Sequence, residues 1–270
     1  MSTLYLVATP IGNLEDITLR ALRVLQEVSL IAAEDTRSAG VLKTRFEIDT
    51  PVTSYFEANK LTKLSVVLDA LSNGDVALIS DAGMPGLSDP GYELVRAAIG
   101  EGYPVVPVPG ASAPVTALVV SGLPSDSFVY LGFLPRRPAD RRRVLRDNAQ
   151  ELRTLVLFET PHRLRECLAD IESIMGDRAI VVCRELTKLY EEILRGTVSE
   201  VLEHFADVKP RGEFTIVLGG APEEERWPEE RVREMLDTLL SQGVARTTAA
   251  KQIASRSGWR RRDVYDLGLC

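Results

Sequence analysis

Short runs of aliphatic and β-branched residues alternate with longer runs of helical period along most of this 270-residue chain. Such alternation is typical of layered α/β domains, in which helices cover a sheet, rather than of β-sandwiches or helical bundles. Several of the short runs also lack alternating polar residues, as expected for a parallel sheet that is covered on both faces. We therefore predict an α/β fold with two sheet domains in tandem and a cleft between them.

The predicted strands fall into two groups of five along the chain. In the first group we expect strands at 4–8, 29–33, 52–54, 76–80 and 105–108, with helices that include 17–27 and 61–72. In the second group we expect strands at 128–133, 154–158, 180–183, 191–194 and 214–218, with helices at 161–175 and 198–205.

Proline, glycine and acidic residues mark the predicted domain boundaries. Gly122–Pro124 is the expected linker between a first domain over 1–122 and a second over 125–221. The acidic run Glu223–Glu225 is expected to lead into a small helical module over 226–270, with helices at 229–240 and 247–255. Because this module is too short for a large core, we expect an accessory unit.

No apolar run approaches the roughly 20 residues that a membrane-spanning helix needs, and no signal peptide precedes the first strand. The expected location is therefore the cytoplasm, without a membrane partner. Cys167, Cys183 and Cys270 are odd in number and widely spaced, which fits reduced thiols better than a disulfide framework. The two histidines of the chain add too few ligands to predict a metal site.

The formal net charge of −7 argues against a nucleic-acid partner, because Lys and Arg supply most non-specific affinity for phosphate. The basic residues are nevertheless concentrated in two short stretches. These are Arg136, Arg137, Arg141, Arg142, Arg143 and Arg146, and then Arg246, Lys251, Arg256, Arg260, Arg261 and Arg262. Each stretch can bind RNA locally, and each can equally be a solvated helix face.

Glycine and proline cluster directly after three of the predicted strands. The three segments are Thr9–Asn13, Ser80–Gly91 and Val108–Ala113. Ligands of open α/β sheets bind at the carboxyl ends of the strands, where glycine permits close approach and proline stiffens a loop. One such segment alone is best explained as a turn with a capping Ser or Asp, but three at one edge predict a ligand site.

Several common ligand motifs are missing from these segments. No G-x-G-x-x-G follows the first strand, and the sequence lacks a P-loop, an acidic-G-x-G signature and a G-x-S-x-G elbow. Dinucleotide-binding, P-loop and serine-hydrolase functions are therefore disfavoured.

Seven motifs together resemble one branch of a known family over nearly the whole chain. They are Ala8–Leu14, Ala33–Arg37, Ser80–Gly91, Pro109–Ser112, Gly132–Pro135, Phe158–Arg163 and Arg184–Lys188. The chain resembles the ribosomal RNA small subunit methyltransferase I branch of the tetrapyrrole (corrin/porphyrin) methylase superfamily. The resemblance implies two α/β domains that hold S-adenosyl-L-methionine in their cleft, and a homodimer. It also implies 2′-O-methylation of a cytidine, cytidine 1402, in the decoding region of 16S ribosomal RNA within or near the small ribosomal subunit.

The resemblance and the position of the loops assign candidate binding residues. The expected cofactor-binding residues are Pro10, Gly12, Asp81, Gly83, Met84, Pro109, Gly110, Ser112, Phe158 and Glu159. The expected RNA-binding residues are Arg37, Arg136, Arg137, Arg141, Arg142, His162, Arg163, Lys188, Arg260 and Arg261. Met84 departs from the branch, which usually has threonine there, so a side-chain hydroxyl near the cofactor is lost while backbone contacts are kept.

Methyl transfer from a sulfonium to an oxygen is an in-line displacement that needs neither a covalent enzyme nucleophile nor a metal. Alignment of the reactants contributes up to about 7–11 kcal/mol in the best intramolecular models, and a nearby group must accept the hydroxyl proton. The candidates are Glu34, Asp35, Asp81, Asp89, Glu159 and Glu185. We rank Asp35 and Asp89 first, although each is also a suitable helix N-cap. Two alternative functions stay open, a tetrapyrrole C-methyltransferase and a non-catalytic ribosome assembly factor.

Overall fold

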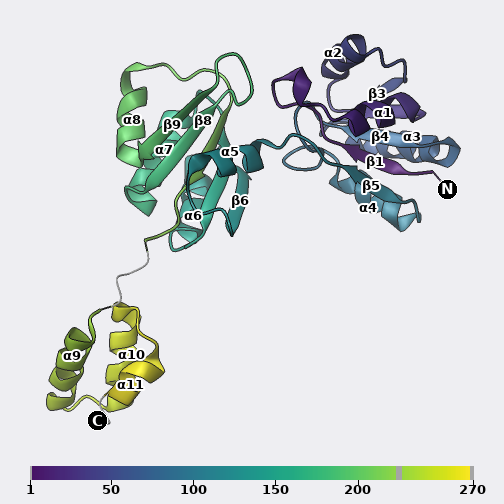
Figure 1. Cartoon of the computed structure of the whole chain (residues 1–270). Helices are drawn as coiled ribbons and strands as arrows, with labels where there is room; N and C mark the ends of the chain where they lie inside the picture. Colours follow the sequence, from purple (N-terminus) through teal and green to yellow (C-terminus); the bar gives the residue numbers. More distant parts are fainter. Residues whose placement is uncertain (1, 223–226, 268–270) are drawn as a thin grey trace. The chain divides into compact units, whose positions relative to one another are not determined.

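The computed structural model describes residues 2–222 and 227–267 and divides into two compact units, 1–220 and 221–270 (Figure 1). Within the first unit, the described residues form two five-stranded sheets with their helices. We call residues 2–108 the first lobe and residues 113–220 the second lobe. The α/β class predicted from the sequence is confirmed.

The first lobe is built on a fully parallel sheet with the strand order β3-β2-β4-β1-β5. Its strands are β1 (Leu4–Val7), β2 (Leu30–Ala33), β3 (Val52–Ser54), β4 (Val76–Ile79) and β5 (Val105–Val108). Its helices are the 3₁₀ turn η1 (Leu14–Asp16), α1 (Leu19–Glu27), α2 (Thr36–Phe46), α3 (Lys60–Asn73) and α4 (Tyr92–Gly100). All five predicted strands are present, and their carboxyl ends lie at one edge.

Apolar cores cover both faces of this sheet, which explains why its strands lack polar alternation. One core contains Val7 with residues of α1 and α2, and the other contains Leu4 with residues of α3 and α4. Since Leu4 and Val7 are three residues apart in one strand, they point to opposite faces. The edge that carries the loops is thereby held rigidly from both sides.

The second lobe contains a mixed sheet with the strand order β6-β7-β10-β8-β9. Its strands are β6 (Phe128–Phe133), β7 (Thr154–Glu159), β8 (Ala179–Arg184), β9 (Glu192–Thr197) and β10 (Phe214–Leu218). β6 is parallel to β7, whereas β10 runs antiparallel to both β7 and β8. The helices are α5 (Ala113–Ser121), α6 (Pro138–Asp147), α7 (Leu164–Met175) and α8 (Val198–Asp207). β9 extends beyond the predicted 191–194 because an edge strand can continue through Arg195 and Gly196 without an apolar pattern.

Helix α5 packs on the second sheet, although the linker was predicted after it at Gly122–Pro124. Its residues Ala117 and Leu118 are buried in one apolar cluster with Val156 of β7 and Val217 of β10. The chain therefore passes from the first sheet to the second between β5 and α5. An apolar helix without clear periodicity can pack on either neighbouring sheet, and the sequence pattern did not distinguish them.

The second unit is a three-helix module in the part of the chain that the structure describes. It contains α9 (Glu229–Ser241), α10 (Arg246–Ser257) and α11 (Arg261–Leu267), which enclose their own small apolar core. The indole Nε1 of Trp259 donates to the Trp227 carbonyl oxygen at 2.7 Å and ties the entry of α9 to the α10–α11 turn. Both predicted helices are confirmed. The acidic run 223–225 and Cys270 lie outside the described residues.

Across residues 2–222 and 227–267, no helix combines the length and apolar character needed to cross a bilayer.

Candidate functional site

A cavity of about 370 Å³ lies where the loop edge of the first lobe meets the second lobe. The first lobe contributes Ile11, Glu34 and residues of the 81–89 loop. Ser112 lies between the lobes, and the second lobe contributes 113–114, Phe133, 158–161, Cys183, Leu186 and 212–215. A site bordered by the carboxyl ends of strands from two lobes agrees with the predicted cleft.

The loops after β1 and β4 are joined at the base of this cavity. Backbone hydrogen bonds connect Thr9 and Gly83 in both directions, at 2.9 and 3.0 Å. The Thr9 hydroxyl also donates to the Ser80 carbonyl oxygen at 3.2 Å. These bonds are formed within the chain and hold the 81–89 loop in place, so its side chains meet the cavity in a preorganised arrangement.

Three carboxylates of the first lobe border the cavity, namely those of Glu34, Asp81 and Asp89. The Asp81 backbone N–H donates to Glu34 Oε2 at 3.3 Å, and the Asp35 backbone N–H donates to Asp81 Oδ1 at 3.1 Å. Burial raises the pKa of Glu34, and the charges of Asp81 and Asp35 raise it further. Negative charge is thus concentrated at this end of the cavity.

Asp89 has the most perturbed carboxyl of this group. Burial raises its pKa to about 6, and the charges of Glu34 and Asp81 act in the same direction against a hydrogen bond with Ser80. A carboxyl that titrates near neutral pH inside a cavity is suited to accept a proton during a reaction.

Asp35, ranked equally from the sequence, lies in a different environment. Its carboxylate caps α2 by accepting from the Arg37 backbone N–H at 2.8 Å, and it forms an ion pair with the exposed Arg37 guanidinium. Hydrogen bonds from Arg37 lower the pKa of Asp35. The capping alternative is confirmed for Asp35, which does not border the cavity. It is wrong for Asp89, because α4 begins at Tyr92 after Gly91.

Six of the ten predicted cofactor-binding residues border the cavity. They are Asp81, Gly83, Met84, Ser112, Phe158 and Glu159. Pro10, Gly12, Pro109 and Gly110 do not border it. A Cβ on Gly12 would overlap Cγ of Lys188, so this glycine allows close approach of the second lobe, and its contact with the cofactor stays a prediction.

An aromatic wall closes one side of the cavity, and the sequence analysis missed part of it. The rings of Phe133 and Phe158 are 5.3 Å apart, and Tyr130 meets Phe158 edge-on at 5.5 Å. Phe133 is 53% exposed, which leaves a ring face available for stacking. Phe133 is the last residue of β6 and lies in the Gly132–Pro135 motif. That motif is the sequence feature from which its place at the cavity could have been predicted.

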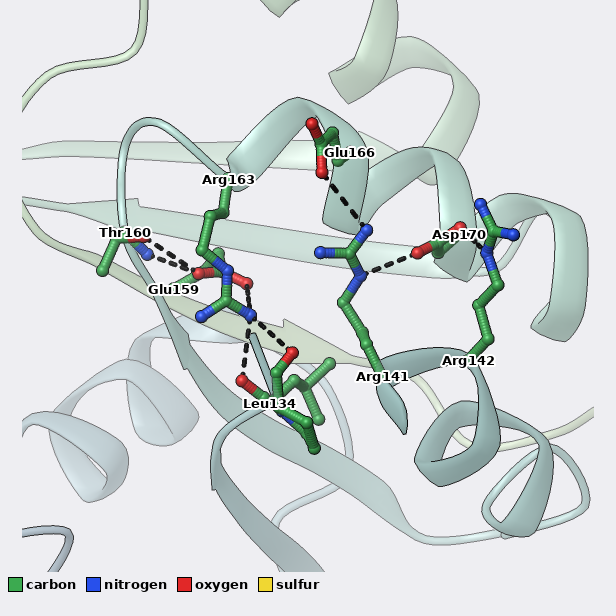
Figure 2. Close-up of polar contacts among 9 residues, drawn as sticks. Leu134, Arg141, Arg142, Glu159, Thr160, Arg163, Glu166 and Asp170 are labelled. Atoms are coloured by element: carbon green, nitrogen blue, oxygen red, sulfur yellow. Dashed lines mark hydrogen bonds and ion pairs between the residues drawn. The ribbon is translucent and has the colours of Figure 1, made fainter. Parts of the chain in front are cut away.

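The position of Arg141 contradicts the predicted RNA-binding role of this residue in the basic stretch 136–146. Its side chain is only 2% exposed and donates to Asp170 at 2.7 Å, with Glu166 at 3.5 Å (Figure 2). Arg142 donates to the other oxygen of Asp170, also at 2.7 Å. The expected RNA contact of Arg141 is therefore wrong, because its guanidinium is sequestered between α6 and α7.

Arg163 also acts inside the second lobe. Its Nη2 donates to the carbonyl oxygens of Leu134 and Pro135 at 2.9 and 3.0 Å and lies 3.3 Å from the Glu159 carboxylate (Figure 2). The Glu159 side chain is fully buried and also accepts from the Thr160 backbone N–H at 2.7 Å. Both charged groups thus hold the turn after β6, while RNA binding by Arg163 and proton acceptance by Glu159 stay predictions.

The remaining basic candidates are distributed over several surfaces. Lys188 is paired with Glu185 at 2.9 Å and with Glu213 at 3.1 Å. The exposed candidates are Arg37, Arg136, Arg137, Arg142, His162, Arg260 and Arg261. Arg136 and Arg137 lie in the turn that Arg163 holds, whereas Arg260 and Arg261 belong to the helical module.

Comparison with known proteins identifies the family to which this chain is similar. Residues 3–202 match the family model described as Tetrapyrrole (Corrin/Porphyrin) Methylases. Ribosomal RNA small subunit methyltransferase I of Halalkalibacterium halodurans is 47% identical over 98% of this chain and 94% of its own. The protein of the same name from Thermotoga maritima is 50% identical over 82% of this chain and 99% of its own. Uroporphyrin-III C-methyltransferase of Thermus thermophilus, solved with S-adenosylhomocysteine, aligns with a TM-score of 0.58 at 21% identity, over 81% of this chain and 97% of that one.

Proposed function

The chain belongs to the tetrapyrrole (corrin/porphyrin) methylase family, and from this premise we propose that it is an S-adenosyl-L-methionine-dependent methyltransferase of ribosomal RNA. Its proposed target is the ribose 2′-hydroxyl of cytidine 1402 in 16S ribosomal RNA. The observation that carries the substrate class is 47% identity, over 98% of the chain, to a protein named for small-subunit RNA. The neighbour named for uroporphyrin-III is only 21% identical, which supports a common fold and no more.

The residues of the cavity fit S-adenosyl-L-methionine. The volume of about 370 Å³ lies in the range of small-molecule pockets. The carboxylates of Glu34, Asp81 and Asp89 suit a ligand with a sulfonium and an ammonium, because they offer negative charge to both cations. Phe133 and Phe158 supply the aromatic faces on which an adenine can stack.

When bound, S-adenosyl-L-methionine supplies a methyl group that its sulfonium already activates. The protein then has to orient the ribose and remove one proton. We assign the proton to Asp89, because it is the cavity carboxyl whose pKa lies near 6. At neutral pH most Asp89 side chains are ionised and ready to accept the proton as the new carbon–oxygen bond forms.

We assign RNA binding to exposed arginines outside the cavity. Arg136 and Arg137 follow Phe133 closely in the chain, on a turn that the buried Arg163 holds by two carbonyl contacts. Their guanidinium groups can bind phosphate in bidentate geometry. Arg260 and Arg261, at the α10–α11 turn of the module, offer two further exposed charges.

The test of the proposed function is mass spectrometry of small-subunit RNA from cells that lack this gene. We expect one 2′-O-methylcytidine to be absent, restored by the wild-type gene and not by Asp89→Asn. Calorimetry with S-adenosyl-L-methionine tests the alternative of a non-catalytic ribosome assembly factor. A protein that binds RNA but not this cofactor would give no binding signal. Unchanged ribose methylation in the deletion strain, or methyl transfer to a porphyrinogen instead, would contradict the proposal.

A separate prediction concerns the helical module. The Thermotoga relative aligns over 99% of its length with only 82% of this chain, a length close to that of the first unit. We propose that the module adds affinity for RNA rather than chemistry. In the full chain, replacing both Arg260 and Arg261 by Ala should raise KM for RNA and reduce its salt dependence, with kcat unchanged.

The size of this effect follows from counterion release, in which each lost phosphate contact lowers the slope of log K against log salt by about one. The matched control removes Arg231 and Arg233 from α9 of the same module, where Arg233 is paired with Glu229 at 2.6 Å. KM and salt slopes that are equal in the two double variants would rule out RNA binding by the α10–α11 turn.

A further inference from the structure

One hydroxyl pair connects the 81–89 loop of the first lobe to strand β6 of the second. Ser88 Oγ lies 2.8 Å from the Tyr130 hydroxyl, a contact between residues 42 positions apart. Ser88 borders the cavity and directly precedes Asp89. A displacement of Ser88 therefore also displaces Asp89, the proposed proton acceptor.

The backbone on both sides of this contact is unusual. Ser88 has a φ of 65°, in the left-handed region that costs free energy for a residue other than glycine. On the opposite side, β6 has an irregular register between Tyr130 and Gly132, and Gly132 has a φ of 61°. Bulges of this kind often lie next to active sites, where they redirect a side chain.

Gly132 also allows β6 to approach Ser88 closely. A Cβ built on Gly132 would lie 2.9 Å from Ser88 Oγ, below the closest normal approach. The bulge therefore aims Tyr130 at Ser88, and the missing side chain at Gly132 leaves room for the contact.

The Tyr130 ring is itself held firmly. It packs against the cluster that contains Ile11 and Leu186 and meets the Phe158 ring edge-on at 5.5 Å. Burial raises the pKa of Tyr130, and the nearby charge of Asp89 raises it further, so the phenol stays neutral as a hydrogen-bonding group. A fixed aromatic ring with a neutral hydroxyl is a suitable positioning device for a loop.

We propose that Tyr130 is a positioning residue that, through its hydrogen bond to Ser88, holds Asp89 in the cavity and links its placement to the contact between the lobes. This inference rests on the proposed function of Asp89. Tyr130 does not border the cavity, and it acts on the reaction only through Ser88.

The main test is Tyr130→Phe, which keeps the ring and removes the hydroxyl. We expect kcat to fall roughly 10- to 100-fold, because misplacing a reacting group by about 1 Å has effects of this size. KM for S-adenosyl-L-methionine and for RNA should change less than twofold. The acid limb of the kcat profile should move below pH 6, because water that enters beside Asp89 reverses part of its desolvation. Tyr103→Phe, in the apolar core of the first lobe, is the matched control.

Carbon-13 NMR of the Asp89 carboxyl gives a readout that does not depend on activity. In Tyr130→Phe its pKa should fall from about 6 toward the ordinary aspartate value, and in Tyr103→Phe it should not move. Ser88→Ala should reproduce the shift, and the double variant should show no further change. If Asp89 titrates identically in the wild type and Tyr130→Phe, the positioning role is excluded. If Tyr130→Phe shifts the pKa of Asp89 but the wild-type protein has no methyltransferase activity, the proposed function is wrong. The positioning role of Tyr130 toward Asp89 is then retained.

Discussion

Asp89→Asn should strongly slow methyl transfer and at the same time stabilise the protein above pH 6. The amide has almost the same shape as the carboxylate but cannot accept the hydroxyl proton. General-base catalysis typically contributes 10²- to 10⁴-fold, so we expect kcat to fall by about that factor. Binding of S-adenosyl-L-methionine should persist, because Glu34 and Asp81 keep their charges at the cavity.

The stabilisation follows from the direction of the Asp89 pKa. Its value of about 6 in the folded protein lies above the ordinary 3.8, so the folded state binds this proton more tightly than the unfolded state. The ionised carboxylate therefore destabilises the fold above pH 6, and this cost disappears as the pH falls from about 6 to about 4. The full pKa difference corresponds to about 3 kcal/mol, and we expect Asp89→Asn to gain about 1–3 kcal/mol at pH 8.

Chemical unfolding of the wild type and the variant at pH 8 and pH 4 measures this difference without any ligand. The gain in free energy of unfolding should be present at pH 8 and absent at pH 4. Asp126→Asn, at an exposed aspartate between α5 and β6, is the control and should change neither stability nor kcat. The wild-type kcat should also fall below about pH 6, as Asp89 becomes protonated. A variant that retains more than a tenth of wild-type kcat would exclude Asp89 as the base.

Asp170→Ala should cause the largest loss of stability among single substitutions in the basic region. Asp170 is 8% exposed in its side chain and binds Arg141 and Arg142 through its two oxygens, each at 2.7 Å (Figure 2). Without it, the carboxylate that stays near the buried Arg141 guanidinium among residues 2–222 and 227–267 is that of Glu166 at 3.5 Å. Removing one partner of a buried ion pair typically costs about 3–5 kcal/mol, which is the loss we expect in free energy of unfolding.

Two further variants separate the buried charge from general damage to α6. Arg141→Met together with Asp170→Leu removes both charges and should recover most of the loss, since apolar replacements of buried pairs are often neutral or better. Arg143→Ala breaks an exposed pair with Asp140 at 3.6 Å and should change stability by less than about 0.5 kcal/mol. A loss below 1 kcal/mol in Asp170→Ala would mean that Arg141 reaches water.

Much of the fold and of the cavity could be predicted from the sequence because these features have local causes. All ten strands of the described lobes were located from short apolar runs, since strand formation and two-sided burial leave a direct pattern. The loop edge was located for the same reason, because glycine and proline directly follow the strands. Asp81, Gly83 and Met84, which follow the fourth strand, border the cavity as that pattern predicted, and their contact with the cofactor stays a prediction.

The choice among similar residues needed the tertiary structure. Arg141, Arg142 and Arg143 are consecutive and chemically identical, yet only Arg141 shares the buried face of α6 with Leu145, four residues further on. Asp35 and Asp89 both follow strands of the first sheet, but one caps a helix at the surface and the other is desolvated beside two carboxylates.

The amino-acid sequence alone determined the α/β layers, the strand positions and the edge that carries the loops, because propensity and periodicity act over a few residues. Its seven motifs also carried the family resemblance. The tertiary structure alone decided that α5 packs on the second sheet, that Arg141 is buried and that Tyr130 reaches Ser88. Each of these outcomes depends on contacts between distant segments, and the desolvation of a side chain is set by everything that surrounds it. Burial and pKa therefore belong to the folded chain and cannot be read from neighbouring residues.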